Sequence, residues 1–200
     1  MTKKNRPPPP QDILKRARAH NDGARAWRQW KDDQAVEVKE LAEKAPRMEL
    51  LELDLEGDLR LVYGLQMPVP RRPNNGRLVV GDRAVFHSVY QEGWRVESPA
   101  GWQPLGLLYP SFDVFHPNMK PSIQGAICLG RKLPPGIPVK EIILLGFAAL
   151  ALQTCTLDET DPDGVVNTVA CEYFRQHEEY MPLTLAGFFD PPETNGKELE

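Results

Sequence analysis

The 200-residue sequence lacks any apolar run of the roughly 18 residues that a membrane span needs. Its first residues, Met1 to Pro7, carry Lys3, Lys4 and Arg6 and lack the apolar stretch of a secretory signal peptide. These two absences predict a cytoplasmic protein with no membrane partner.

Cysteine is also scarce, since only Cys128, Cys155 and Cys171 are present and no two of them form a CxxC pair. This spacing speaks against a zinc finger and against the dense disulfide framework of small secreted domains. We therefore expect three reduced thiols and no metal site.

A large excess of one charge is missing as well, but the net charge of −4 is unevenly distributed. Residues 1–31 hold nine Lys and Arg against two Asp, whereas residues 32–63 hold ten Asp and Glu against four Lys and Arg. A basic segment can bind nucleic acid through phosphate contacts, yet no aromatic stacking platform or reading motif accompanies it. We expect no nucleic-acid partner, and interpret the segment as a solvated helix face or a surface that docks on an acidic protein.

What is present falls into three parts. Four prolines, Pro7 to Pro10, cannot continue a helix and predict a flexible, basic N-terminus over residues 1–10. Residues 11–189 have the length and hydrophobic content of one globular domain with a normal core. Residues 190–200 are polar and predict a frayed tail.

Hydrophobic periodicity predicts an α+β order of elements in residues 11–189. A helical pattern runs from Asp12 to Lys44, and Asn21-Asp22-Gly23 predicts either a kink or a division into two helices. Alternating runs then predict a hairpin over 51–65, an exposed loop over 68–76, and strands over 77–80, 84–90, 94–96 and 107–109. Two helices follow, over 139–154 and 165–180. Successive strands of this kind favour an antiparallel meander.

One stretch carries most of the chemistry. Tyr109-Pro110 is followed by His116-Pro117-Asn118 and then by Gly125-Ala126-Ile127-Cys128-Leu129. This series resembles the active-site signature of the ubiquitin-conjugating enzymes, a Tyr-Pro, a His-Pro-Asn and a Gly-x-Ile-Cys-Leu in succession. The resemblance implies the UBC-like fold: an N-terminal helix, an antiparallel β-meander, an active-site loop and C-terminal helices. It also implies an enzyme that accepts a ubiquitin-like protein from an activating enzyme as a thioester on Cys128. That enzyme passes the modifier to an acceptor protein without a metal or organic cofactor.

Cys128 is the nucleophile that the resemblance implies. A thioester carrier needs a thiol that another protein can reach, so we expect Cys128 in a shallow groove beside irregular backbone, which Gly125 and Gly130 allow. The alternative for a cysteine between Ile127 and Leu129 is a small, buried hydrophobic side chain.

The resemblance assigns roles to the loop before Cys128. It implies that Asn118 is the amide donor that stabilises the oxyanion formed when an amine attacks the thioester. The alternative is an asparagine that braces its loop through backbone hydrogen bonds, and both roles can hold together. His116 is implied to pin the loop without acting as a base, Pro117 to fix the chain direction, and Gly125 to belong to the same structural loop.

Two further contacts are implied outside this loop. Asp163, in the acidic stretch between the two C-terminal helices, is implied to position the incoming lysine and accept or relay its proton. Its alternative role is the N-cap of the second helix, which Asp161 could also fill. Lys15, Arg16 and Arg18 are implied to contact the activating enzyme, or else they form part of a solvated face.

The sequence departs from the family pattern in its loops. Asn118 and Cys128 are separated by two residues more than usual, and residues 133–138 replace a Trp-Ser-Pro that normally contributes to ligase binding. Such a divergent, compact chain is typical of a bacterial member that acts beside its own activating enzyme in defence against phage.

Three other functions stay open. A UBC-fold adaptor would bind a ubiquitin-like protein without a thioester. A cysteine peptidase would pair Cys128 with His177 or His116, although the apolar helical stripe around His177 favours a packed histidine. A nucleic-acid binder would use residues 1–31, with an affinity that falls steeply with salt.

Overall fold

The computed structural model describes residues 11–72, 77–110, 113–119, 125–158 and 166–192, without the side chains of residues 11–14 and 16–18. The described residues form an α+β fold around a four-stranded antiparallel sheet of order β1-β2-β3-β4, which confirms the predicted class and meander. The helices are α1 (Gln11–Lys44), α2 (Val139–Leu150) and α3 (Thr168–Gln176), with the short 3-10 helices η1 (Glu92–Arg95) and η2 (Glu178–Tyr180). The strands are β1 (Met48–Asp54), β2 (Leu59–Arg71), β3 (Val79–Tyr90) and β4 (Leu105–Tyr109).

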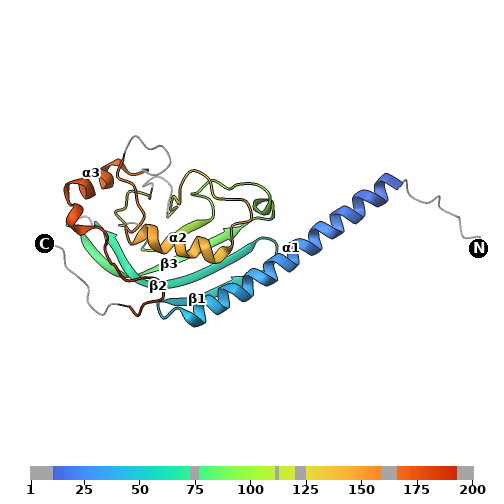
Figure 1. Ribbon diagram of the computed structural model, residues 1–200, viewed down its shortest axis with the longest axis horizontal. Helices are drawn as coiled ribbons and strands as arrows, with labels where there is room; N and C mark the ends of the chain where they lie inside the picture. Colours follow the sequence, from blue (N-terminus) through green and yellow to red (C-terminus); the bar gives the residue numbers. More distant parts are fainter. Residues whose placement is uncertain (1–10, 73–76, 111–112, 120–124, 159–165, 193–200) are drawn as a thin grey trace, which may run out of the picture.

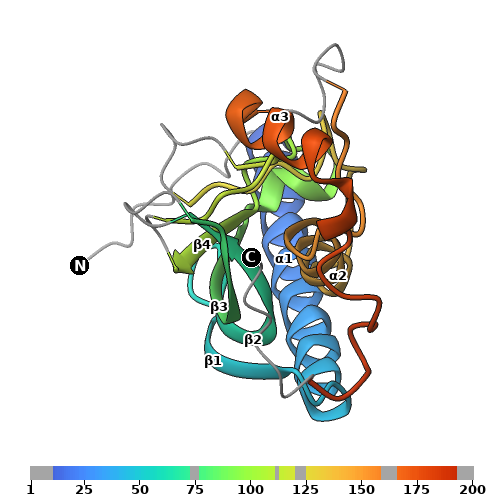
Figure 2. The ribbon, with the colours of Figure 1, turned by 90° about the vertical axis from the view of Figure 1, so that its left-hand side faces the viewer.

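The helices α1 and α2 cover the same face of the sheet, as Figures 1 and 2 show. The C-terminal half of α1 runs beside β1, whereas its N-terminal half extends beyond the sheet (Figure 1). Trp27, Val38 and Leu41 are buried and attach the C-terminal half to the body. Lys31 strengthens the attachment, because its ammonium donates to the carbonyl of Gly57 in the β1–β2 turn over 2.9 Å.

The expected kink or break at Asn21-Asp22-Gly23 is absent, and α1 is one continuous helix. A Cβ atom placed on Gly23 would meet nothing within 4 Å, so this glycine lies on the open part of the helix. Glycine costs about 1 kcal/mol relative to alanine inside a helix. Extending a formed helix is far easier than nucleating one, so the helix that forms in the attached C-terminal half can extend toward the N-terminus through Gly23.

The strands are longer than the sequence predicted. Residues 68–71, expected in a loop, continue β2, and the pairing with β3 shifts register between Gln66 and Val69. Pro68 falls within this irregularity, where the missing N–H of a proline does not interrupt the ladder. Residues 94–96 were also predicted wrongly as a strand, since Trp94 belongs to η1 and packs its buried ring against Tyr90.

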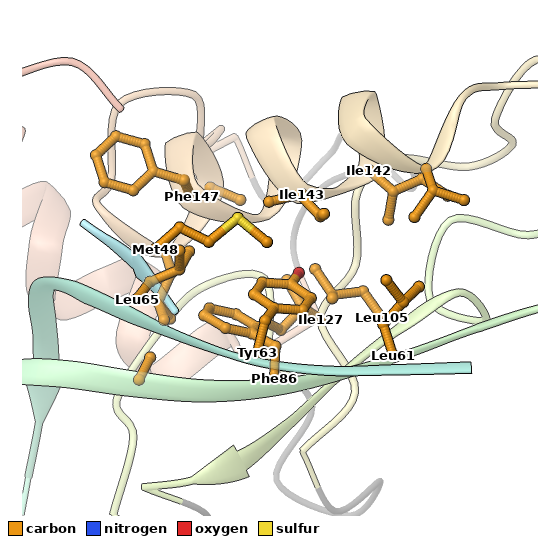
Figure 3. Close-up of a cluster of buried hydrophobic side chains, with 14 of the residues drawn as sticks. Met48, Leu61, Tyr63, Leu65, Phe86, Leu105, Ile127, Ile142, Ile143 and Phe147 are labelled. Carbon is orange, nitrogen blue, oxygen red and sulfur yellow. The ribbon is translucent and has the colours of Figure 1, made fainter. Parts of the chain in front are cut away.

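The core lies between the sheet and α2 (Figure 3). The rings of Tyr63 and Phe86, from β2 and β3, stack with centroids 5.2 Å apart. Ile143 of α2 lies above the Tyr63 ring and Ile142 above Leu105 (Figure 3), and both isoleucines are fully buried. Ile127, next to Cys128, reaches into the same core, so its burial anchors the cysteine-bearing segment to the sheet.

Both C-terminal helices are shorter than predicted. The chain leaves α2 through Leu152, whose φ of 57° lies in the left-handed region that commonly ends a helix. The next helix, α3, begins at Thr168 because the side chain of Asn167 accepts a hydrogen bond from the backbone N–H of Ala170 and caps it.

The first residues of the predicted polar tail are held on the body. The buried Arg47 donates from Nε to the carbonyl of Asp190 over 2.8 Å and from Nη2 to the carbonyl of Pro191 over 2.7 Å. Residues 193–200 and the predicted flexible N-terminus, 1–10, lie outside the described residues.

Candidate functional site

The segment that carries Cys128 extends the sheet beyond β4. The N–H of Leu107 donates to Gly125 over 2.6 Å, and the N–H of Ile127 donates to Leu105 over 3.3 Å. Past the cysteine, the N–H of Leu129 donates to Gly101 over 3.1 Å. Cys128 therefore lies on a strand-like segment whose neighbouring residues are held by β4 and the loop before it.

On its other side Cys128 pairs with Asn118. The N–H of Cys128 donates to the carbonyl of Asn118 over 2.8 Å, and the side-chain Nδ2 of Asn118 donates to the carbonyl of Cys128 over 3.0 Å. An isolated antiparallel bridge joins Met119 to Ile127 beside them. The His-Pro-Asn and Cys motifs are thus brought together by reciprocal hydrogen bonds.

The thiol of Cys128 is less open than we expected. Only 8% of the residue is exposed, and Sγ lies 3.4 Å from the carbonyl oxygen of Gly130, toward which the S–H points. We expected a thiol that another protein can reach in a shallow groove, whereas the described residues on both sides of Cys128 are hydrogen-bonded to neighbouring segments and the thiol is largely covered.

Two glycines allow this packing. Gly125 has φ +75°, and a Cβ there would lie 2.3 Å from the carbonyl oxygen of Leu107, so a side chain is excluded both by conformation and by space. Gly101 faces Gly130 so closely that a Cβ on Gly101 would lie 1.9 Å from the Gly130 oxygen. Gly125 was expected in the structural loop, whereas Gly101 was not predicted, because no local pattern marks a glycine that faces a segment 29 positions away.

His116 is fully buried and engaged at both ring nitrogens. The N–H of Asn118 donates to Nδ1 over 3.0 Å, so the ring proton is on Nε2, which donates to the carbonyl of Ala149 over 2.7 Å. Burial lowers the pKa of His116 to about 4, which keeps the ring neutral. A neutral imidazole with both nitrogens occupied can brace the loop against α2 but has no lone pair left to take a proton from Cys128.

The carbonyl of Pro117 is bound to the start of α3. The N–H groups of Val166 and Asn167 both donate to it over 3.0 Å. Asp163 lies outside the described residues, so its predicted contact with an incoming lysine stays a prediction. The alternative that Asp161 or Asp163 caps the following helix is wrong, since Asn167 is the N-cap of α3.

The other histidine considered for catalysis, His177, is half-buried and lies between two tyrosine rings. His177 follows α3; its ring stacks on that of Tyr180 with centroids 5.4 Å apart and is tilted against that of Tyr173, 4.5 Å away. Its Nδ1 lies 3.2 Å from the carboxylate of Glu179. These contacts give His177 a packing role next to α3.

Of the proposed docking cations, Lys15 is exposed on the part of α1 that extends beyond the sheet, and the side chains of Arg16 and Arg18 are not among those described. The three cysteines form no disulfide. Cys155 is half-buried, and burial raises the pKa of its thiol to about 11, while the buried Cys171 donates to the carbonyl of Leu157 over 2.9 Å. Over the described ranges, no three His, Cys, Asp or Glu side chains gather in a way that could hold a metal ion.

Among the described residues, no helix has the length and apolarity to cross a membrane. Comparison of the chain with protein-family models, with curated proteins and with solved structures gave no match. The fold and the site define an α+β protein in which a cysteine-bearing strand segment is paired with a His-Pro-Asn loop.

Proposed function

We propose that this chain is a ubiquitin-conjugating-type enzyme with a UBC-like fold. It accepts a ubiquitin-like protein from an activating enzyme as a thioester on Cys128 and transfers it to an acceptor amine. The observation that carries the proposal is the pairing of Asn118 with Cys128, which joins the two motifs named in the resemblance within one site.

The chemistry needs two acyl transfers. In the first, the Cys128 thiolate attacks the thioester that joins the modifier to the activating enzyme, and the thiol of the activating enzyme leaves. In the second, the acceptor amine attacks the carbonyl carbon, an oxyanion forms, and the Cys128 thiolate leaves as the amide forms. The ammonium proton passes to a carboxylate, for which Asp163 is the candidate.

Asn118 can serve this reaction in two ways. One N–H of its side-chain amide is used by the carbonyl of Cys128, which supports a bracing role. An amide nitrogen has two N–H donors, so the second is the one that would meet a developing oxyanion. The Oδ1 atom of Asn118 is buried and has no hydrogen-bond partner among the described residues.

The remaining parts of the proposal rest on the resemblance. An acidic surface of the activating enzyme docks on the basic N-terminal part of α1, which contains Lys15, Arg16 and Arg18. The protein acts in the cytoplasm of a bacterium, in a conjugation system that defends against phage.

The test is a charging assay with ATP, a cognate activating enzyme and its ubiquitin-like protein, resolved on gels with and without reducing agent. We expect a reductant-sensitive adduct that disappears in Cys128→Ala and persists in Cys155→Ala, the matched control for a half-buried thiol. If the activating enzyme is charged and wild-type chain still forms no adduct, the proposal is wrong.

A second candidate, a non-catalytic adaptor that binds the ubiquitin-like protein without a thioester, is favoured by the low exposure of Cys128. Thiol labelling separates the two. An enzyme should be alkylated by iodoacetamide at Cys128 in its native state and lose charging as labelling proceeds. An adaptor should leave Cys128 unlabelled until the chain unfolds, and should bind the modifier equally well as Cys128→Ala.

A further inference from the structure

The end of β2 is joined to the residues that lead into the His-Pro-Asn loop. Arg71 forms an isolated antiparallel bridge with Val114. The N–H of Arg72 donates to the carbonyl of Asp113 over 2.7 Å, and the N–H of Phe115 donates to the carbonyl of Pro70 over 2.9 Å. Residues 113–115 are therefore a short extra strand on β2, and His116 follows it directly.

A two-pronged ion pair reinforces this strand. The Nε of Arg71 lies 2.9 Å from each carboxylate oxygen of Asp113, and its Nη2 lies 2.5 Å from Oδ2. The two side chains are 30% and 22% exposed, so the pair is partly shielded from water. A fork of this kind fixes orientation as well as distance, which a single ammonium cannot do. Gly81 of β3 leaves room for it, since a Cβ there would lie 3.2 Å from Cδ of Arg71.

The next residue ties the same strand to α3. The guanidinium carbon of Arg72 lies 4.9 Å from the ring centroid of Phe115 and 5.4 Å from that of Tyr173. The two rings meet edge to face with centroids 5.5 Å apart. Cation–π contacts of this kind are attractive and fix which ring faces the cation.

We propose that Arg71 and Asp113 are positioning residues for the transfer step, because they hold residues 113–115 in register on β2 and thereby set where His116 and Asn118 stand beside Cys128. The inference rests on the proposed function of Cys128. Neither residue contacts the reacting atoms. Their effect is transmitted by two hydrogen bonds, one from the backbone N–H of Asn118 to His116 and one from the side-chain amide of Asn118 to the carbonyl of Cys128. Displacing a reacting group by about 1 Å can slow an enzyme on the order of a hundredfold.

The test compares Arg71→Lys, which keeps the charge and loses the fork, with Asp113→Asn, which keeps the shape and loses the charge. The exchanged pair, Arg71→Asp with Asp113→Arg, tests rescue. The matched control is Arg83→Lys, since Arg83 forms an exposed ion pair with Glu49 over 3.0 Å between β3 and β1.

Two readouts are taken on each variant. The first is single-turnover discharge of the Cys128 thioester to free lysine at rising lysine concentration. We expect ordinary charging, an unchanged half-saturating lysine concentration and a limiting discharge rate at least tenfold lower in both single variants, with partial recovery in the exchanged pair. The second is amide hydrogen exchange at Asn118 and Cys128, which we expect to accelerate at least tenfold in the single variants and not in Arg83→Lys.

If wild type charges and the single variants discharge at the wild-type rate, the positioning role is wrong. A slower discharge that only parallels a lower melting temperature, with no recovery in the exchanged pair, assigns Arg71 and Asp113 to stability alone and also overturns the inference. If wild type forms no thioester, the proposed function fails. Amide hydrogen exchange still tests the link between the ion pair and the loop, and an unchanged exchange rate at Asn118 in the single variants would reject that link.

Discussion

The side-chain Nδ2 of Asn118 lies 3.0 Å from the carbonyl oxygen of Cys128, while the N–H of Cys128 lies 2.8 Å from the carbonyl oxygen of Asn118. Asn118 and Cys128 are thus joined by two hydrogen bonds, one from the Asn118 side chain and one between their backbones. The side-chain amide of Asn118 is therefore hydrogen-bonded before any substrate is present, so its bracing role and the proposed oxyanion role have to be measured separately.

Asn118→Ala should lower the free energy of unfolding by about 1–3 kcal/mol, because it leaves the carbonyl of Cys128 without its donor. If the second N–H also meets the oxyanion, the discharge of the thioester should slow by about 10²–10³ while charging is retained. Urea unfolding and single-turnover discharge measure the two effects. Unaltered discharge in a destabilised variant would leave Asn118 with the bracing role alone.

Gly101→Ala should destabilise the chain by about 1–3 kcal/mol, since its new methyl group would overlap the carbonyl oxygen of Gly130 and push the paired segments apart. The S–H of Cys128 points at the same oxygen, so we also expect faster alkylation of Cys128. Gly93→Ala is the control, because a Cβ at Gly93 meets nothing within 4 Å. Equal behaviour of the two variants in denaturant would contradict the close approach.

The burial of His116 predicts how stability depends on pH. Its folded pKa is lowered from 6.5 to about 4, so between these values the unfolded chain binds a proton that the folded chain does not. Stability from this group is full above about pH 6.5 and falls by up to roughly 3 kcal/mol as the pH drops to about 4. The difference in unfolding free energy between wild type and His116→Gln isolates the effect from carboxylate titration. The difference should shrink as the pH falls, and a constant difference from pH 7 to 4 would exclude it.

Gln34→Ala should lower the unfolding free energy by about 1–3 kcal/mol. The Oε1 of Gln34, on α1, accepts from the N–H of Val139 at the start of α2 over 2.7 Å, and that N–H is buried. Pro138 cannot replace it, because it offers no side-chain cap. The control Gln29→Ala breaks an exposed bond to Asp33 and should change stability by less than about 0.5 kcal/mol.

Tyr63→Phe should leave the protein as stable or raise its unfolding free energy by about 1 kcal/mol. The Tyr63 hydroxyl is buried between the sheet and α2 and has no hydrogen-bond partner within the described chain (Figure 3). Removing an unsatisfied group removes its desolvation cost. Tyr90→Phe is the opposite case, because its hydroxyl donates to the carbonyl of Trp94 over 3.2 Å, and it should lose stability. Thermal and urea unfolding should show no loss of stability in Tyr63→Phe and a loss in Tyr90→Phe.

Local patterns were enough to predict much of the fold. The apolar run in residues 142–152 correctly indicated a core helix, and the alternation around Leu53 and Leu61 indicated paired strands. The predicted strand boundaries were wrong where turn-forming residues lie in a segment that pairs with another strand. Pro68 and Pro70 are typical of a loop, but this segment continues β2 because it pairs with β3 on one side and with residues 113–115 on the other.

The site was predictable only in part. His116, Asn118, Gly125 and Cys128 lie close together in a stretch that resembles a known motif, and the structure brings the loop and the cysteine together. Asn167 was missed as the cap of α3, although an asparagine before an apolar helix is a local signal that could have found it. Gly101, Arg71 and Asp113 carry no such local signal.

By itself the sequence determined the α+β class, the order of the elements and the residues of the motif, because these depend on periodicity and on spacing along the chain. Only the tertiary structure decided how far Cys128 is buried, which nitrogen of His116 holds the proton, and that Arg71 meets Asp113 across 42 positions. Such contacts depend on which distant segments pair. A pairwise hydrogen bond or close approach between them leaves no pattern in either segment taken alone.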